Sequence, residues 1–101
     1  MMVESGPVFE RTCRQLLDSF FQRYPSEALR LAAHRGLTIL LTRRPSWPGK
    51  PGGWAAGLVY AMSSIGAGVP GVLNSDLEEA LGVTMSKVYK RAARIKKIVR
   101  R

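Results

Sequence analysis

The sequence has little of the chemistry that most enzymes and metal proteins use. It contains one cysteine, Cys13, and one histidine, His34, in 101 residues. A single cysteine cannot form an intrachain disulfide, and one cysteine with one histidine makes none of the usual zinc spacings. None of the acidic residues pairs with His34 or Cys13 in a spacing typical of acid–base or nucleophilic catalysis. We therefore expect a protein that is not an enzyme and that needs no metal or cofactor.

Long apolar runs are missing as well. The stretch from Trp54 to Met62 is nine residues without a charged or strongly polar side chain, whereas a membrane span needs roughly 20 residues. Near the N-terminus, Glu4, Glu10 and Arg11 interrupt the place where the apolar part of a signal peptide would lie. We therefore expect a cytoplasmic protein that makes no contact with a membrane.

Acidic residues are absent from the C-terminal end. Residues 1–83 carry eight basic and seven acidic side chains, a net charge of +1, whereas residues 87–101 carry eight basic side chains and no acid. The total of +9 is therefore concentrated at one end of a nearly neutral chain. Such a block of positive charge attracts a polyanion, most often nucleic acid.

Two N-terminal segments have helical periodicity. Apolar residues at three- and four-residue steps predict a first helix from Pro7 or Val8 to Tyr24 and a second, after an N-cap at Ser26, to Arg43 or Arg44. The segment 37–42 is also compatible with a short strand, but we favour a helix because the sequence offers no partner strand.

Side chains in these two helices also have predicted places. Cys13 lies on the apolar stripe of the first helix, which predicts a buried, inert thiol. His34 lies at the edge of the second stripe, and we interpret it as a surface or boundary residue.

The middle of the chain predicts a connector and a central helix. Residues 44–53 are rich in proline and glycine, which is typical of a connector. Residues 54–65 follow as a helix that is apolar on all sides, and such a helix is buried. We interpret Trp47 as a lid over the core rather than as a binding aromatic. Residues 66–71 match G-x-G-x-x-G, but a helix precedes them instead of the strand that a dinucleotide site requires, so they predict a turn.

The C-terminal quarter, residues 75–100, predicts a helix-turn-helix. Ser75 and Glu78 have the spacing of a capping box for a short helix over residues 76–81, and Gly82 is suited to end that helix. Thr84 would then cap a longer helix that extends to about Arg100.

The predicted last helix has an apolar and a basic face. Met85, Val88, Ala92, Ile95 and Val99 form the inward stripe, and the basic residues lie opposite. In recognition helices the first turns touch base edges and later positions hold phosphates. The predicted nucleic-acid contacts are Thr84, Ser86, Lys87, Lys90, Arg91, Arg94, Lys97 and Arg101.

The stretch from Gly49 to Ala61, with its Gly/Pro turn and Ala-rich helix, followed by the capped Gly82-Val-Thr84 turn, resembles a family of small prokaryotic proteins. Those proteins are similar to the cyclin-box repeat of transcription factor IIB and its archaeal counterpart. The likeness covers about residues 49–95. It implies that Ser86, Lys87, Lys90, Arg91 and Arg94 would enter the major groove. Many cyclin-box modules bind proteins instead of DNA, so the resemblance is also compatible with a protein partner.

We therefore expect one all-α domain over residues 1–101, with about five helices in a cyclin-box-like bundle around a buried central helix. The function that we expect is binding of double-stranded DNA, as in a small transcription regulator. The alternative is a protein-interaction adaptor with a basic surface and no DNA specificity.

Overall fold

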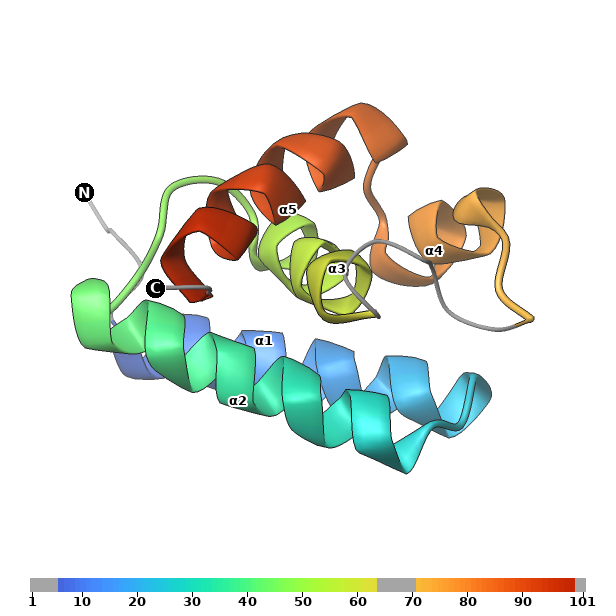
Figure 1. Ribbon diagram of the computed structural model, residues 1–101, viewed down its shortest axis with the longest axis horizontal. Helices are drawn as coiled ribbons and strands as arrows, with labels where there is room; N and C mark the ends of the chain where they lie inside the picture. The colour runs from blue at the N-terminus through green and yellow to red at the C-terminus, as the bar shows by residue number, and fades with distance from the viewer. Residues whose placement is uncertain (1–5, 64–70, 100–101) are drawn as a thin grey trace.

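The computed structural model describes residues 6–63 and 71–99. In these residues the chain forms five α-helices and no strand (Figure 1), which confirms the predicted all-α class. The segment 37–42 belongs to the second helix, so its helical interpretation is confirmed. The helices are α1 (Gly6–Arg23), α2 (Glu27–Arg43), α3 (Pro51–Met62), α4 (Asn74–Leu81) and α5 (Met85–Val99).

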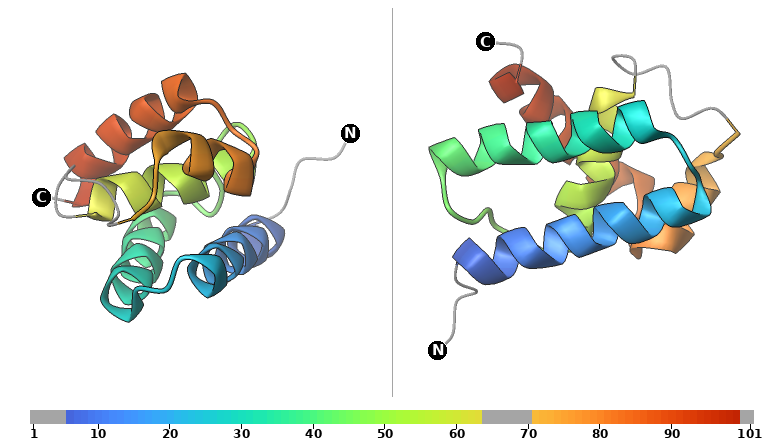
Figure 2. Two further views of the ribbon diagram at one scale, coloured as in Figure 1. Left: turned by 90° about the vertical axis from the view of Figure 1, so that its right-hand side faces the viewer. Right: turned by 90° about the horizontal axis from the view of Figure 1, so that it is seen from below.

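The helices lie in two layers. Figure 2 shows α1 and α2 side by side and antiparallel in one layer, with α3, α4 and α5 in the other. The helix α5 packs mainly on α3 and also on α2, while α4 packs on α3 and α1. The two C-terminal helices therefore both pack on α3, which itself packs on α1 and α2. No helix in the described residues is both long and apolar enough to cross a membrane.

The predicted stripe of α1 forms its side of the core. Phe9, Cys13, Leu17 and Phe20 are at most 2% exposed, which confirms the buried position of the thiol. The helix ends at Arg23, just before Pro25, because the residue that precedes a proline disfavours helical geometry. Ser26 occupies the N-cap position of α2, but its hydroxyl makes no capping hydrogen bond.

The central helix α3 begins three residues earlier than predicted. Pro51 takes its first turn, where a proline ring is already set for helical geometry and no amide hydrogen bond is lost. Gly52 and Gly53 therefore lie inside the helix, and the connector ends at Lys50. A side chain on Gly52 would lie 2.6 Å from the Leu81 carbonyl oxygen, so the close approach of α4 requires glycine there. The helix ends at Met62, and the predicted end at residue 65 lies outside the described residues.

Trp47 is the lid that the sequence predicted. Only 6% of its surface is exposed, and its ring centroid lies 5.3 Å from that of Trp54. The Trp47 Nε1 donates a hydrogen bond to the Leu40 carbonyl oxygen at 3.2 Å, and the Trp54 Nε1 donates one to the Pro48 carbonyl oxygen at 2.7 Å. The connector is thereby fastened to α2 and α3.

The predicted capping box of α4 is wrong. The helix starts at Asn74, and the amide of Leu73 donates to the Asp76 carboxylate at 3.0 Å. Ser75 consequently lies inside the first turn, and Glu78 is free to accept a hydrogen bond from the Met85 amide at 2.7 Å. The glutamate therefore caps the next helix instead of its own. The predicted turn at 66–71 lies outside the described residues except for Gly71.

Candidate nucleic-acid interface

The turn between α4 and α5 sets where the basic helix begins. Gly82 ends α4 in the left-handed conformation at φ 65°, as its sequence position predicted. Thr84 is the residue before α5, and its hydroxyl accepts a hydrogen bond from the Lys87 amide at 3.4 Å. Its carbonyl oxygen accepts another from the Val88 amide at 3.0 Å. Together with the bond from the Met85 amide to the Glu78 carboxylate, these bonds engage the amides of Met85, Lys87 and Val88 at the start of α5.

The apolar stripe of α5 faces the core as predicted. Val88, Ala92 and Ile95 are at most 2% exposed, and Met85 and Val99 are partly buried against the same core. This packing fixes the rotation of the helix about its own axis, because turning it would expose the three buried side chains.

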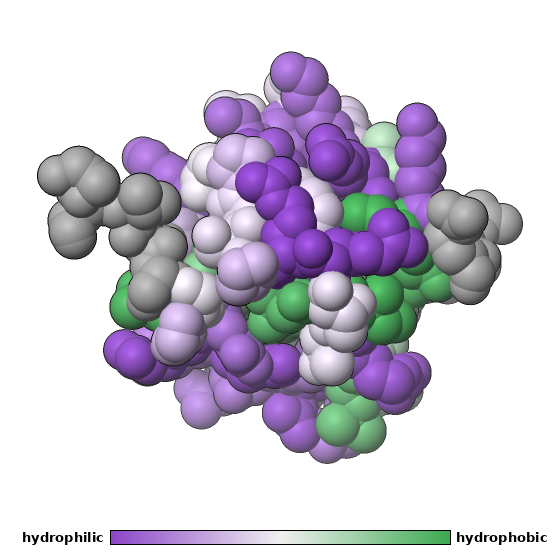
Figure 3. Space-filling view, turned by 90° about the vertical axis from the view of Figure 1, so that its left-hand side faces the viewer, coloured by the Kyte–Doolittle hydropathy of each residue, from purple (hydrophilic) through white to green (hydrophobic). Residues whose placement is uncertain are grey.

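The opposite face of α5 carries its cations into solvent. Six of the eight predicted contact residues are exposed along this helix and its N-cap, namely Thr84, Ser86, Lys87, Lys90, Arg94 and Lys97. Arg101 lies outside the described residues. Figure 3 views the molecule from the side where the C-terminal end of α5 lies, and hydrophilic side chains cover the upper part of this face. Within residues 6–63 and 71–99, the ion pairs all lie in α1 and α2, so none of them neutralises a cation of α5.

Arg91 does not lie on the outward face where the sequence placed it. Its side chain is half-buried, and its guanidinium carbon lies 4.6 Å from the centroid of the Trp54 ring. The Nε is buried and finds no hydrogen-bond partner among the described residues. One step along the helix from Ala92, Arg91 is at the edge of the buried stripe, and the stem packs over Gly57.

The Arg94 side chain contacts the lid. Its guanidinium carbon lies 5.3 Å from the centroid of the Trp47 ring, and that of Arg44 lies 5.0 Å from the same ring. Such cation–π contacts stabilise by about 0.5–1 kcal/mol at exposed sites. They hold Arg94 in place beside the connector although it remains exposed. The sequence had assigned no connection between Trp47 and the basic helix.

A hollow of about 350 Å³ brings the connector next to the start of α5. Lys50 comes from the connector and Lys87 from the first turn of α5, so residues 37 positions apart share one depression. The sequence gives no signal for Lys50, because this residue stands alone in a proline- and glycine-rich connector that has no phosphate-loop motif. We call this depression the connector hollow. It is lined by Gly49, Lys50, Gly53, Gly82, Val83, Thr84 and Lys87.

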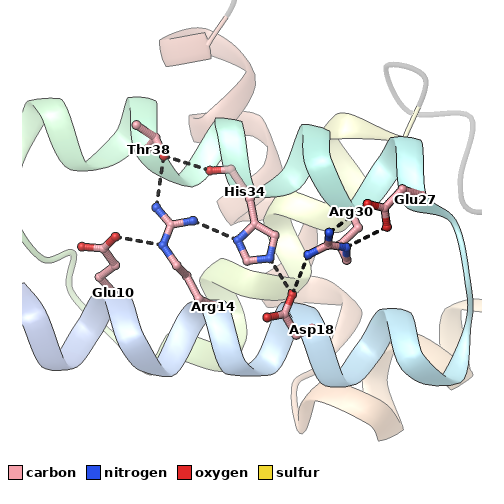
Figure 4. Close-up of polar contacts among 7 residues, drawn as sticks. All are labelled: Glu10, Arg14, Asp18, Glu27, Arg30, His34 and Thr38. Carbon is pink, nitrogen blue, oxygen red and sulfur yellow. Dashed lines mark hydrogen bonds and ion pairs between the residues drawn. The ribbon is translucent and has the colours of Figure 1, made fainter.

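A second polar cluster joins α1 to α2 on the other layer (Figure 4). The Nδ1 of His34 lies 2.8 Å from Nη1 of Arg14, and its Nε2 lies 2.8 Å from Oδ1 of Asp18. Because a guanidinium only donates hydrogen bonds, Nδ1 must accept and the ring proton is on Nε2, which donates to Asp18. His34 therefore lies at the boundary between the helices, as predicted, and bridges a cation to an anion.

The remaining members extend this cluster along both helices. Arg30 donates to Asp18 at 3.2 Å and to Glu27 at 2.9 Å, while Arg14 donates to Glu10 at 2.8 Å and to the Thr38 hydroxyl at 3.1 Å. Partial burial raises the pKa of Asp18, but hydrogen bonds from His34 and Arg30 outweigh it and leave the pKa lowered. The hydrogen bond from Arg30 likewise lowers the pKa of Glu27. Both guanidinium groups of the cluster are therefore paired with carboxylates.

Comparison of the chain with models of protein families, with curated proteins and with solved structures finds no match.

Proposed function

We propose that this protein is a DNA-binding module of the helix-turn-helix type, in which α5 is the recognition helix. The observation that carries the proposal is the row of exposed cations on α5, which no carboxylate of the described residues neutralises. A helix whose apolar side is buried and whose basic side is free presents a rigid positive edge to a polyanion.

The order of side chains along α5 suggests a division of roles. Ser86, Lys87 and Lys90 stand in the first turns, where recognition helices reach base edges. Arg94 and Lys97 stand further along, where contacts to phosphates would position the helix without reading sequence. Arg91 supports the helix through Trp54, and the proposal assigns it no base contact. The cyclin-box-like arrangement, a small transcription regulator and a cytoplasmic location belong to the same proposal.

The test is selection from a random duplex library, followed by affinity measurements across a salt series. With Arg94 and Lys97 assigned to phosphates, the logarithm of the association constant should fall against the logarithm of salt concentration with a slope of about −2 or steeper. Replacing Lys87 and Lys90 with Ala should change the sequence preference, whereas Lys97→Ala should weaken all sequences alike. An affinity that does not change with salt, or no binding at all, would overturn the proposal.

The second candidate is a protein-interaction adaptor that meets an acidic partner with the same face. Tyr89, which is 46% exposed on α5, gives that helix an aromatic side chain of the kind enriched in protein interfaces. A stoichiometric complex in a pull-down that survives nuclease treatment would favour this candidate over DNA.

A further inference from the structure

The connector hollow has the chemistry of an anion site. Of its seven lining residues, Lys50 and Lys87 are charged and both are positive, Thr84 contributes a hydroxyl, and none is acidic. Neither lysine makes an ion pair within the part of the chain that the structure describes. Two like charges that share one depression repel each other, so an anion between them would be stabilised by both.

A carboxylate at the turn before α5 is engaged in a hydrogen bond. Glu78 accepts from the Met85 amide at the turn that borders the hollow. The amide of Lys87 is likewise held by the Thr84 hydroxyl. Two of the first amides of α5 are therefore engaged, and the lysine side chains supply the positive charge of the hollow.

Arg91 adds a third cation beside the hollow. Its Nη2 contacts Gly49, and its Nε would lie 3.7 Å from a side chain placed on Gly53, so the guanidinium borders two lining residues. Held against Trp54, this guanidinium has a fixed position. Two lysines therefore line the depression and the Arg91 guanidinium lies beside it, and two of these groups, Lys87 and Arg91, are on the helix proposed to lie on DNA.

We infer that the connector hollow binds one phosphate of the DNA backbone, with Lys50 as an anchor outside the helix-turn-helix. This inference rests on the proposed function, since it places Lys50 against the same duplex that α5 enters. The phosphate contact is assigned to Lys50, and Lys87, which lines the same hollow, adds positive charge beside it. The connector then fixes how deeply and at what angle α5 enters the groove.

The first experiment compares Lys50→Ala with the wild-type chain on the selected duplex and on unrelated duplexes. Loss of one phosphate contact should weaken binding to all of them by up to about fivefold and reduce the salt slope by about 0.9. Lys50→Arg should restore both values. Arg35→Ala is the matched control, because it removes one exposed positive charge from α2, outside the hollow, and should change neither value beyond a small effect of net charge. Equal values for Lys50→Ala and Arg35→Ala would overturn the inference.

The second experiment locates the phosphate. Single phosphates of the duplex are replaced in turn by neutral methylphosphonates, and each duplex is measured with the wild type and with Lys50→Ala. At one position the neutral group should weaken wild-type binding but leave Lys50→Ala binding unchanged, because the two changes remove the same contact. If the neutral group lowers the affinity of both proteins equally at every position, the hollow holds no backbone phosphate, even if α5 binds DNA. If the wild type binds no duplex, the proposed function and this inference both fail.

Discussion

The two layers of this molecule treat charge in opposite ways. Between α1 and α2, Arg14, His34, Asp18 and Arg30 are linked in one chain of hydrogen bonds at 2.8–3.2 Å, and each positive group there has a partner. On α5, the exposed lysines and Arg94 have no carboxylate partner among the described residues. The first arrangement joins two helices. The second leaves a positive surface whose natural counterion comes from another molecule.

This difference indicates which parts of the chain stabilise the fold and which are available for binding. Surface ion pairs contribute at most about 1 kcal/mol each, so the stability of the α1–α2 layer depends chiefly on its apolar core. The position of α5 depends on α3, because α5 packs mainly on that helix and its buried side chains are Val88, Ala92 and Ile95. Changes to α3 should therefore destabilise the protein, changes to the exposed cations should affect binding, and changes to the α1–α2 cluster should have a small effect on stability alone.

The largest effect is expected for Trp54→Ala. The ring is 1% exposed, packs against Trp47 and carries the Arg91 guanidinium. Its removal should lower the free energy of unfolding by about 3–5 kcal/mol, because a large buried cavity would remain. Urea unfolding followed by circular dichroism measures this. A loss below about 1 kcal/mol would show that α3 is not the element on which α5 depends.

An intermediate effect is expected when Lys90, Arg94 and Lys97 are replaced together by Ala. All three side chains are exposed, so the free energy of unfolding should change by less than about 1 kcal/mol, the loss of the Arg94 contact with Trp47 included. DNA affinity should fall roughly 100-fold at low salt, and the salt slope should become shallower by about 1.8, because Arg94 and Lys97 are the two residues of this set that are assigned to phosphates. Unfolding and binding measured on the same preparation separate the two effects. A variant with lowered stability and unchanged DNA affinity would show that these cations hold the fold and do not bind DNA.

The smallest effect is expected for Asp18→Asn. The side chain is 51% exposed, and its loss removes the ion pair with Arg30 and weakens the hydrogen bond from His34, which should cost less than about 1 kcal/mol near neutral pH. Because the pKa of Asp18 is lowered in the folded protein, its contribution is fully present above the ordinary value of about 3.9 and is lost as the pH falls through the lowered value.

The pH dependence supplies the measurement. The difference in stability between the wild type and Asp18→Asn should be fully present above about pH 5 and should shrink below about pH 4. DNA binding by this variant should equal that of the wild type, since Asp18 lies on the other layer. A difference that grows on acidification would contradict the pairing described for the cluster.

Periodicity and turn chemistry predicted a large share of the fold. The stripes of α1 and α5, the buried α3, the lid formed by Trp47 and the caps at Gly82 and Thr84 all follow from residue types within one or two turns of each other. These features are local, so a sequence window contains the cause. The start of α3 was predicted too late because glycine is a poor helix former, while close packing on α4 requires it there.

The candidate site shows where such reasoning ends. A helical period tells which side chains share a face, and it predicted the exposed positions of Lys87, Lys90, Arg94 and Lys97. It did not predict that Arg91, at the edge of the stripe, would be drawn onto Trp54. Whether a residue at the edge of the stripe points inward depends on which side chain of the neighbouring helix lies opposite it. Only the way α5 crosses α3 determines this.

By itself, the sequence determined the helical class, the apolar face of each terminal helix and the concentration of positive charge at one end, because these depend on residue type and short spacing. Only the tertiary structure decided that Lys50 meets Lys87, that Glu78 caps α5 and that His34 links Arg14 to Asp18. The physical reason is that these contacts join separate elements, and their distances are set by how the helices pack in three dimensions.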